Sequence, residues 1–433
     1  MTDSRYRTTK LVSGTGLLLY LLGFFIPFAV SGPHVTGSIY VTPGLIIGVI
    51  ASIFLLINRD IGRRLLFLFL MICIFSIITL IRHPVSSFLI SISALTLILL
   101  ILTIPVRKIK AVSNLFNGFF TSLMIILALL FLEILSQVFG FNQVYLFLRS
   151  LFTGAEHIAS GHNYMLFYFR PYVSFAEPAH LAYYLAFSYA IIDQIQNEKY
   201  YWLKLVTLAG LILLGSLAGY VLILVYVLAK FIIDNNSIFF FTGLKIDRKK
   251  ILKLLALLVF VGIALPVAWA HSEFANFILS RFTSRVAQIT GALFDANVSS
   301  SAGVRSGAYI VLIDYWRTSG LLGVLIGTGY ANYSEWMIQY YGGSQYTTFS
   351  TGRLHSYGIV IILSTGLVGL AFYMTFLYSV FRYFGQQKNI AVIVLVVVAH
   401  FASGSLLDFT KWQLLFVLLS TFLLNARMQY DAK

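Results

Sequence analysis

Apolar runs close to membrane-spanning length recur along the whole chain and are separated by short polar or charged breaks. A spanning helix needs roughly 20 apolar residues, and cutting the sequence at its breaks predicts twelve such helices. We therefore expect an all-α polytopic membrane protein with about 12 transmembrane helices. Their approximate ranges are 11–31, 41–58, 65–81, 85–105, 115–138, 176–193, 203–217, 218–233, 253–269, 356–381, 389–403 and 411–426.

The seventh and eighth predicted helices are short and follow one another directly. The sequence Gly-Ser-Leu-Ala-Gly at 215–219 interrupts this apolar stretch, and basic residues stand at both of its ends. Glycine pairs of this kind favour a turn. The pattern indicates a tight hairpin of two crossings and not one tilted helix.

The charges agree with a membrane protein and fix its expected orientation. Hydrophobic residues make up 59% of the chain and charged residues 10%, a balance that excludes an ordinary soluble enzyme. The formal net charge of +15 comes from residues in the loops, so we interpret it as a topology signal and expect no nucleic-acid partner. With both termini cytoplasmic, 21 Lys and Arg lie inside and nine outside, as the positive-inside rule requires.

No stretch of the sequence is typical of an interdomain linker, so residues 1–433 are predicted to form a single integral membrane domain. Two outer loops are long, 139–175 and 270–355. Loops of the second length are usually functional. Its centre is too charged to span and suits short helices lying at the membrane interface. Its second half is crowded with Trp and Tyr, which are typical of an interface belt and also offer flat faces to sugar rings.

Arginine dominates the outer side. Eight of the nine outer basic residues are arginine, whereas the inner loops mix lysine and arginine. The guanidinium group binds phosphate in a bidentate manner and keeps its charge. Positive charge is disfavoured outside, so these arginines indicate an anionic partner there.

Several kinds of catalytic site have no sequence support. The chain contains no GxxxxGK[ST], no HExxH and no DxD, so no metal site or cofactor is expected. The glycines of the GTG at 327–329 are interpreted as loop or turn residues. Without a metal, arginines are the groups that would stabilise negative charge on a diphosphate leaving group.

Four arginines are candidates for that role. Arg281 and Arg285 are four residues apart and share one face if the segment is helical. They bind either an anion or lipid phosphates. Arg170 and Arg305 lie beside apolar segments, where a site and a structural ion pair are equally good interpretations.

Three ionisable residues lie at the outer ends of predicted helices. Glu177 and His180 are three apart at the start of the sixth helix, where a carboxylate also serves as a simple cap. His355 precedes the tenth helix and is either a hydrogen-bonding group at the interface or a base. Glu133 lies within the fifth helix, and such a group faces a cavity or a partner.

Four segments of the chain together resemble a known family. They are RPYVSFAEPAHLAYYLA, GSLAGYVLILVYVLA, the stretch from Arg305 through Trp316 to GTGYANY, and LHSYGIVIILSTGLVGLAFY. In this order they resemble the Wzy-type O-antigen and capsule polymerases, which are related to the O-antigen ligases. The resemblance covers roughly residues 165–380, and the arginine-to-glycine repeats at fixed spacing found in some members are missing.

The resemblance implies a GT-C-like membrane glycosyltransferase of the bacterial inner membrane, multi-pass, acting at its outer face. Such enzymes transfer a growing chain from undecaprenyl diphosphate to a new lipid-linked repeat unit, without metal or cofactor. Donor and acceptor lipids, membrane lipids and a chain-length regulator protein are the implied partners. The implied catalytic residues are Glu177 and His355, and the implied substrate-binding residues are Arg170, Arg281, Arg285, Arg305, His180 and Tyr330.

Two alternatives stay open. An O-antigen ligase uses the same donor and transfers the polymer to lipid A-core. A flippase or transporter for the same lipid is expected to carry internal repeats and charges at mid-membrane depth. Here Glu133 is nearly alone at that depth, which favours an enzyme.

Overall fold

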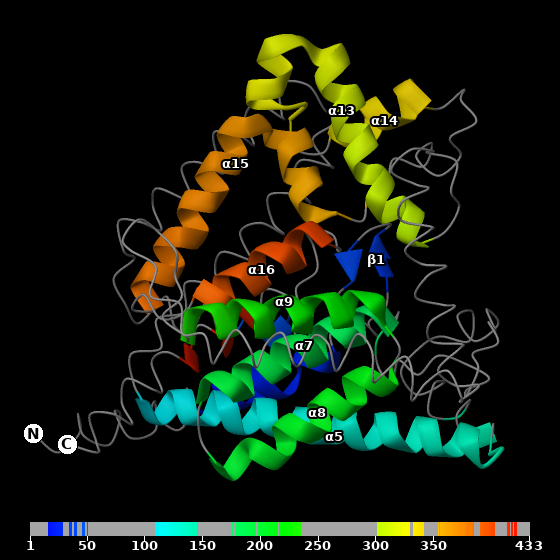
Figure 1. Cartoon of the computed structure of the whole chain (residues 1–433), viewed down its shortest axis with the longest axis vertical. Helices are drawn as coiled ribbons and strands as arrows, with labels where there is room; N and C mark the ends of the chain where they lie inside the picture. The colour runs from blue at the N-terminus through cyan, green and yellow to red at the C-terminus, as the bar shows by residue number, and fades with distance from the viewer. Residues whose placement is uncertain are drawn as a thin grey trace, which may run out of the picture.

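The computed structural model describes the chain in segments, which are mostly helical (Figure 1). A two-stranded antiparallel hairpin of β1 (His34–Thr36) and β2 (Ile39–Tyr40) is the exception within them. The predicted helical class is therefore confirmed, while the number of spans stays a prediction. The described residues are 16–28, 34–36, 39–40, 46–47, 50, 109–141, 143–144, 147, 173, 175, 178–195, 198–214, 216–234, 301–329, 332–341, 354, 356–384, 390–402, 414–415, 417–418 and 420–421.

The predicted spans that fall on described residues are helical, with bounds that differ by a few residues. Predicted spans 65–81, 85–105 and 253–269 lie outside the described residues, and span 41–58 is described only at 46–47 and 50. The helices are 16–24 with the 3-10 turn η1 (Ile26–Phe28), α5 (Ile109–Val138), α7 (Pro178–Ile195), α8 (Tyr201–Leu213) preceded by η3 (Glu198–Tyr200), α9 (Leu217–Asp234), α13 (Ser301–Ile326), α14 (Asn332–Tyr341), α15 (Tyr357–Phe384) and α16 (Ile390–Ala402).

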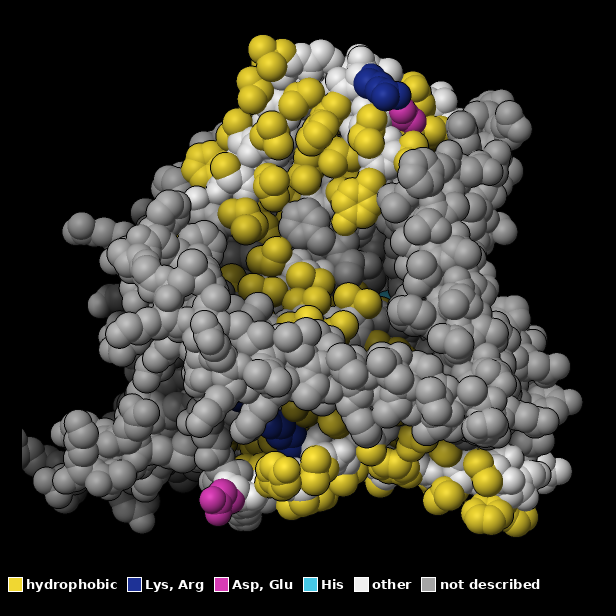
Figure 2. All heavy atoms as spheres, viewed as in Figure 1, with side chains coloured by type: hydrophobic (Ala, Val, Ile, Leu, Met, Phe, Trp, Pro, Cys, Tyr) yellow, Lys and Arg dark blue, Asp and Glu magenta, His cyan; other side chains and the backbone are white. Residues whose placement is uncertain are grey.

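Among the described helices, three are long and apolar enough to cross a membrane. They are Val112–Val138 in α5, Gly307–Ile326 in α13 and Gly358–Thr375 in α15. The second lies in the centre of the 270–355 loop, so the prediction that this stretch is too charged to span is wrong by length and composition. Large apolar side chains are also exposed, including Leu321 and Leu322 at 77% and 68%. Figure 2 shows such side chains gathered on the part of the surface formed by α13 and α15. Apolar exposure on this scale is typical of a surface that meets lipid or a partner, because water disfavours it.

The first helix packs against α5 at glycine residues. A Cβ on Gly118 would overlap the carbonyl of Tyr20, and one on Gly23 would overlap the carbonyl of Leu115. Small residues at such a crossing allow two backbones to approach closely, which is how membrane helices gain packing energy without a hydrophobic driving force. This contact places α5 at the edge of a buried cluster that also includes α7, α8, α9 and α16.

The predicted hairpin at 215–219 is confirmed as a break between α8 and α9. The two helices contact α7 more than each other, so α7 lies between them, as Figure 1 shows. At the ends of these helices, the Asp193 carboxylate forms ion pairs with the ammonium groups of Lys204 and Lys230, each with an N–O distance of 2.5 Å. The Asp193 side chain is only 7% exposed. The hydroxyl of Tyr226 donates to the same carboxylate at 2.8 Å. This cluster joins the three helices through one buried charge.

A second buried cluster holds α13, α14 and the first half of α15 together. Figure 1 shows these elements at the opposite end of the molecule from α5 and α8. Both α13 and α15 contain a glycine with non-helical backbone angles, Gly320 at φ 64°, ψ 179° and Gly366 at φ 65°, ψ −168°. Each helix therefore consists of two straight pieces joined at a bend. In α13 the piece before the bend runs from Ser301 to Ser319 and is about 28 Å long at 1.5 Å per residue, close to the thickness of the hydrocarbon core of a bilayer.

Candidate functional site

The bend of α15 is held by the loop that follows α13. A helix that breaks at Gly366 leaves carbonyls before the break without donors from its own next turn. The backbone N–H of Thr328 donates to the carbonyl of Leu363 at 2.8 Å, and that of Gly329 donates to Ser364 at 2.9 Å. The Thr328 hydroxyl adds a second bond to Leu363 at 3.0 Å. The GTG loop thus replaces the hydrogen bonds that the break removes.

This contact is between backbones and needs glycine on both sides. A Cβ on Gly366 would overlap the carbonyl of Leu325 and lie 2.5 Å from the nitrogen of Ile326. A Cβ on Gly327 would lie 2.6 Å from the nitrogens of Thr365 and Gly366. Gly327 and Gly329 also have positive φ of 74° and 91°. The prediction that the GTG glycines are loop or turn residues is confirmed, since they lie in the loop after α13.

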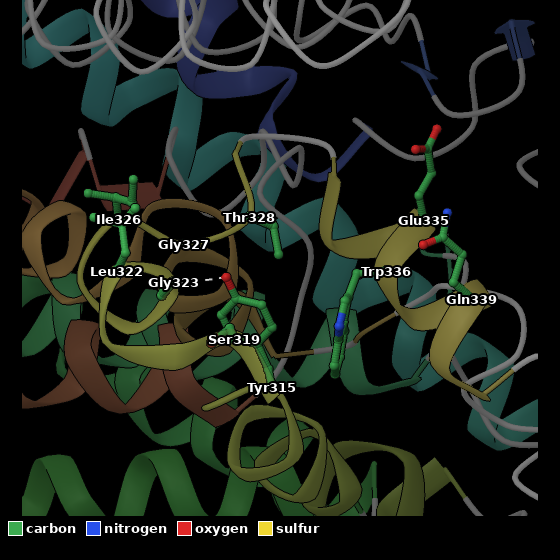
Figure 3. Close-up of a pocket in the computed structure, with 10 residues that line it drawn as sticks. All are labelled: Tyr315, Ser319, Leu322, Gly323, Ile326, Gly327, Thr328, Glu335, Trp336 and Gln339. Carbon is green, nitrogen blue, oxygen red and sulfur yellow. Dashed lines mark hydrogen bonds between the residues drawn. The ribbon is translucent and has the colours of Figure 1, made fainter. Parts of the chain in front are cut away.

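A pocket of about 450 Å³ lies beside this loop, between α13 and α14 (Figure 3). Gly327 and Thr328 of the loop line it, together with the aromatic rings of Tyr315 and Trp336. Its size is typical of small-molecule sites. The remaining lining residues are Ser319, Leu322, Gly323 and Ile326 from α13 and Glu335 and Gln339 from α14.

Aromatic contacts fix the wall that α14 contributes. The ring of Trp336 stacks on Tyr340 with centroids 5.0 Å apart, and meets Tyr315 edge to face at 5.1 Å. The hydroxyl of Tyr341 donates to the Asp314 carboxylate at 2.8 Å, which ties α14 to α13. Such ring pairs each add about 0.5–1.5 kcal/mol beyond the area they bury. Trp336 is therefore held in place before any ligand arrives.

Two of the segments that resemble the polymerase family meet beside this pocket, through the GTG loop and one buried cluster. Arg305 lies in the first turns of α13, and its side chain is outside the described set. Leu354 and Ser356, which flank His355, are buried, and Leu354 packs in the same cluster as Ala308 of α13. His355, like Tyr330 directly after the GTG, lies outside the described residues, as do Arg281 and Arg285.

The segment before α7 is held by the predicted intramembrane carboxylate. Glu133 is 1% exposed, and its Oε2 accepts the backbone N–H of Val173 at 3.2 Å. Val173 has a φ of 52°, which is unusual for a β-branched residue. The expectation that Glu133 faces a partner is confirmed. The partner is the backbone of the segment that leads into the predicted Glu177 and His180.

The other predicted residues of this segment are described only in part. Phe175 is buried against Tyr184, with ring centroids 5.5 Å apart. His180 is half-buried in the first turn of α7. Arg170 and Glu177 lie outside the described residues.

Sequence reasoning missed most of the pocket, including three of its polar side chains. Ser319, Glu335 and Gln339 were not singled out, although the four-residue spacing of the last two on a helix places them on one face. The aromatic crowding of this loop was the available signal. Where the structure describes the chain, no three His, Cys, Asp or Glu residues group as metal ligands would.

No protein-family model matches this chain, and no curated protein sequence matches it either.

Proposed function

We propose that the protein is a glycosyltransferase that polymerises undecaprenyl-diphosphate-linked oligosaccharide repeat units into O-antigen or capsular polysaccharide. The reaction would take place at the outer face of the bacterial plasma membrane, with no metal ion taking part. The observation that carries the proposal is the meeting of family-like segments. The helix with Arg305, the GTG loop and the residues that flank His355 pack in one cluster or bond to it directly.

The chemistry follows from the groups expected at that face. A hydroxyl of the acceptor sugar attacks the anomeric carbon of the donor, and the bond from this carbon to the diphosphate oxygen breaks. The leaving diphosphate gains negative charge, which Arg281, Arg285 and Arg305 would stabilise. The proton of the attacking hydroxyl would pass to Glu177 or His355. Glu177 is the preferred base because its neighbours Phe175, Ala176 and Pro178 are apolar, and such surroundings make a carboxylate more basic.

Deletion of the gene followed by gel analysis of surface polysaccharide tests the proposal. Deletion of a polymerase removes the ladder of bands that long polysaccharide chains give on the gel, and leaves a single repeat unit attached to the cell surface. Loss of every attached repeat unit points to a ligase or a flippase instead, and accumulation of lipid-linked long polymer identifies the ligase. An unchanged ladder refutes all three functions.

Substitutions in the complemented strain test the roles of individual residues. Lysine keeps the charge of arginine but lacks the planar guanidinium group that binds phosphate through two hydrogen bonds. Arg281→Lys, Arg285→Lys and Arg305→Lys should therefore each shorten the polymer nearly as much as alanine does. Full-length polymer from all three at normal expression would refute diphosphate binding by this group. Glu177→Gln keeps the shape of the side chain and removes its basicity. If this variant is active while His355→Ala is inactive, His355 is the base and Glu177 is not.

A further inference from the structure

The pocket between α13 and α14 differs chemically from a diphosphate site. Its described lining residues include one carboxylate, Glu335, and neither lysine nor arginine. A carboxylate repels a diphosphate at short range, and the described lining residues include no cationic side chain that would attract one. The lining instead combines two aromatic rings with an amide, hydroxyls and the carboxylate. This set matches a ligand with an apolar ring face and a rim of hydroxyl groups.

We propose that this pocket is a subsite for a neutral sugar ring of the repeat unit. The C–H face of a pyranose packs on an aromatic ring, and Trp336, already fixed by Tyr315 and Tyr340, offers such a ring. Figure 3 shows Glu335 and Gln339 side by side on α14 next to Trp336. Carboxylate and amide groups accept from and donate to sugar hydroxyls.

The opposite wall contributes a further polar group. The Oγ atom of Ser319 is buried and has no hydrogen-bond partner in the structure. A buried polar atom without a hydrogen-bond partner destabilises the fold, because it has lost its bonds to water. A ligand hydroxyl at this wall would restore one hydrogen bond. Ser319 and Gln339 lie on different helices, so a ring in the pocket would have polar groups of both α13 and α14 available to it.

The inference rests on the proposed polymerase function for the identity of the ligand, and direct binding tests it separately. The probe is the host strain's own repeat-unit oligosaccharide, freed from its lipid diphosphate by mild acid hydrolysis. The full-length protein is held in lipid nanodiscs, because maltoside detergents carry sugar headgroups that compete. Binding is measured by saturation-transfer difference NMR titration.

Variants at the exposed rim separate binding from folding. Glu335→Gln and Gln339→Ala should each raise Kd roughly 3- to 10-fold, because each removes or weakens one hydrogen bond of about 0.5–1.5 kcal/mol. Trp336→Phe keeps an aromatic core and should raise Kd by a similar factor through its smaller face. Ile338→Ala is the matched control: this exposed residue of α14 lies outside the pocket lining and should leave Kd unchanged.

Three results would overturn the subsite. The first is an unchanged Kd in all of the rim and Trp336 variants. The second is an equal loss in Ile338→Ala, and the third is competition by inorganic pyrophosphate, which would make the pocket a phosphate site. These outcomes leave the polymerase proposal intact, whereas an unchanged ladder in the deletion strain refutes the polymerase and leaves sugar binding measurable.

Discussion

The backbone contact between the GTG loop and the bend of α15 predicts that Gly366→Ala is strongly destabilising. Gly366 has φ 65° and ψ −168°, a region that only glycine occupies without strain, and forcing alanine there costs about 1–3 kcal/mol. The new Cβ would also overlap the carbonyl of Leu325, which belongs to the backbone and cannot rotate away. The loop must therefore shift, and with it the two hydrogen bonds that Thr328 and Gly329 donate.

Gly320→Ala provides the matched control. Gly320 has nearly the same backbone angles, φ 64° and ψ 179°, but a Cβ there meets nothing within 4 Å. It carries the conformational cost alone. Two lost hydrogen bonds at about 1 kcal/mol each put the difference between the two variants at about 2 kcal/mol or more. That difference corresponds to a factor of roughly 30 in the folded-to-unfolded ratio.

The difference is measured by reversible unfolding of the purified protein in mixed micelles, followed by intrinsic tryptophan fluorescence. We expect the free energy of unfolding to fall in the order wild type, Gly320→Ala, Gly366→Ala. In cells, at matched amounts in the membrane, Gly366→Ala should lose more polymer than Gly320→Ala. Equal free energies for the two alanine variants would refute the reasoning, because the contact with Leu325 would then contribute nothing.

Three further predictions concern other parts of the chain. Glu133→Leu should lower the free energy of unfolding by about 1–3 kcal/mol, because it leaves the N–H of Val173 without an acceptor. Glu133→Gln keeps a carbonyl acceptor and should keep most of the stability. An unchanged free energy of unfolding in the leucine variant would contradict this. Asp193→Asn leaves two partly exposed lysines without a counter-charge, so it should lower the free energy of unfolding by about 1–3 kcal/mol in the same assay. This loss is smaller than that from breaking a fully buried ion pair. In a cysteine-free background, Ile246→Cys should be labelled only from the cytoplasm and Ser344→Cys only from outside, and outer labelling at 246 would overturn the topology.

Hydropathy correctly predicted the helices whose own sequence is a long apolar run. The spans at 176–193, 356–381 and 389–403 reappear as α7, α15 and α16 with small shifts, because a long apolar run has few alternatives to a helix in a membrane. The break between α8 and α9 was also predictable, since glycine stands in the middle of the run. In these places local composition and the final fold agree.

The bends inside α13 and α15 were not predicted. Gly366 lies within IILSTGLVGL, a segment whose overall hydropathy predicts one continuous helix, and glycines are common inside membrane helices. Its bend is decided by a loop more than 35 residues earlier in the chain, which approaches closely enough to replace the missing hydrogen bonds. The pocket has the same origin. Aromatic crowding predicted flat faces in this loop, but only the packing of α13 on α14 sets Trp336 opposite Ser319.

The hydrogen bonds of the GTG loop also decide what this loop does in the site. Glycine-rich loops often bind phosphate through free backbone amides. Here the amide of Gly327 donates to Gly323 at 2.8 Å, and those of Thr328 and Gly329 donate to α15. All three amides are therefore engaged within the fold, and none is left for a diphosphate. Under the proposed function, phosphate recognition would therefore fall to the outer arginines, and polar recognition in the pocket to side chains of its walls. The loop itself holds the bend of α15 and lines the pocket together with Trp336.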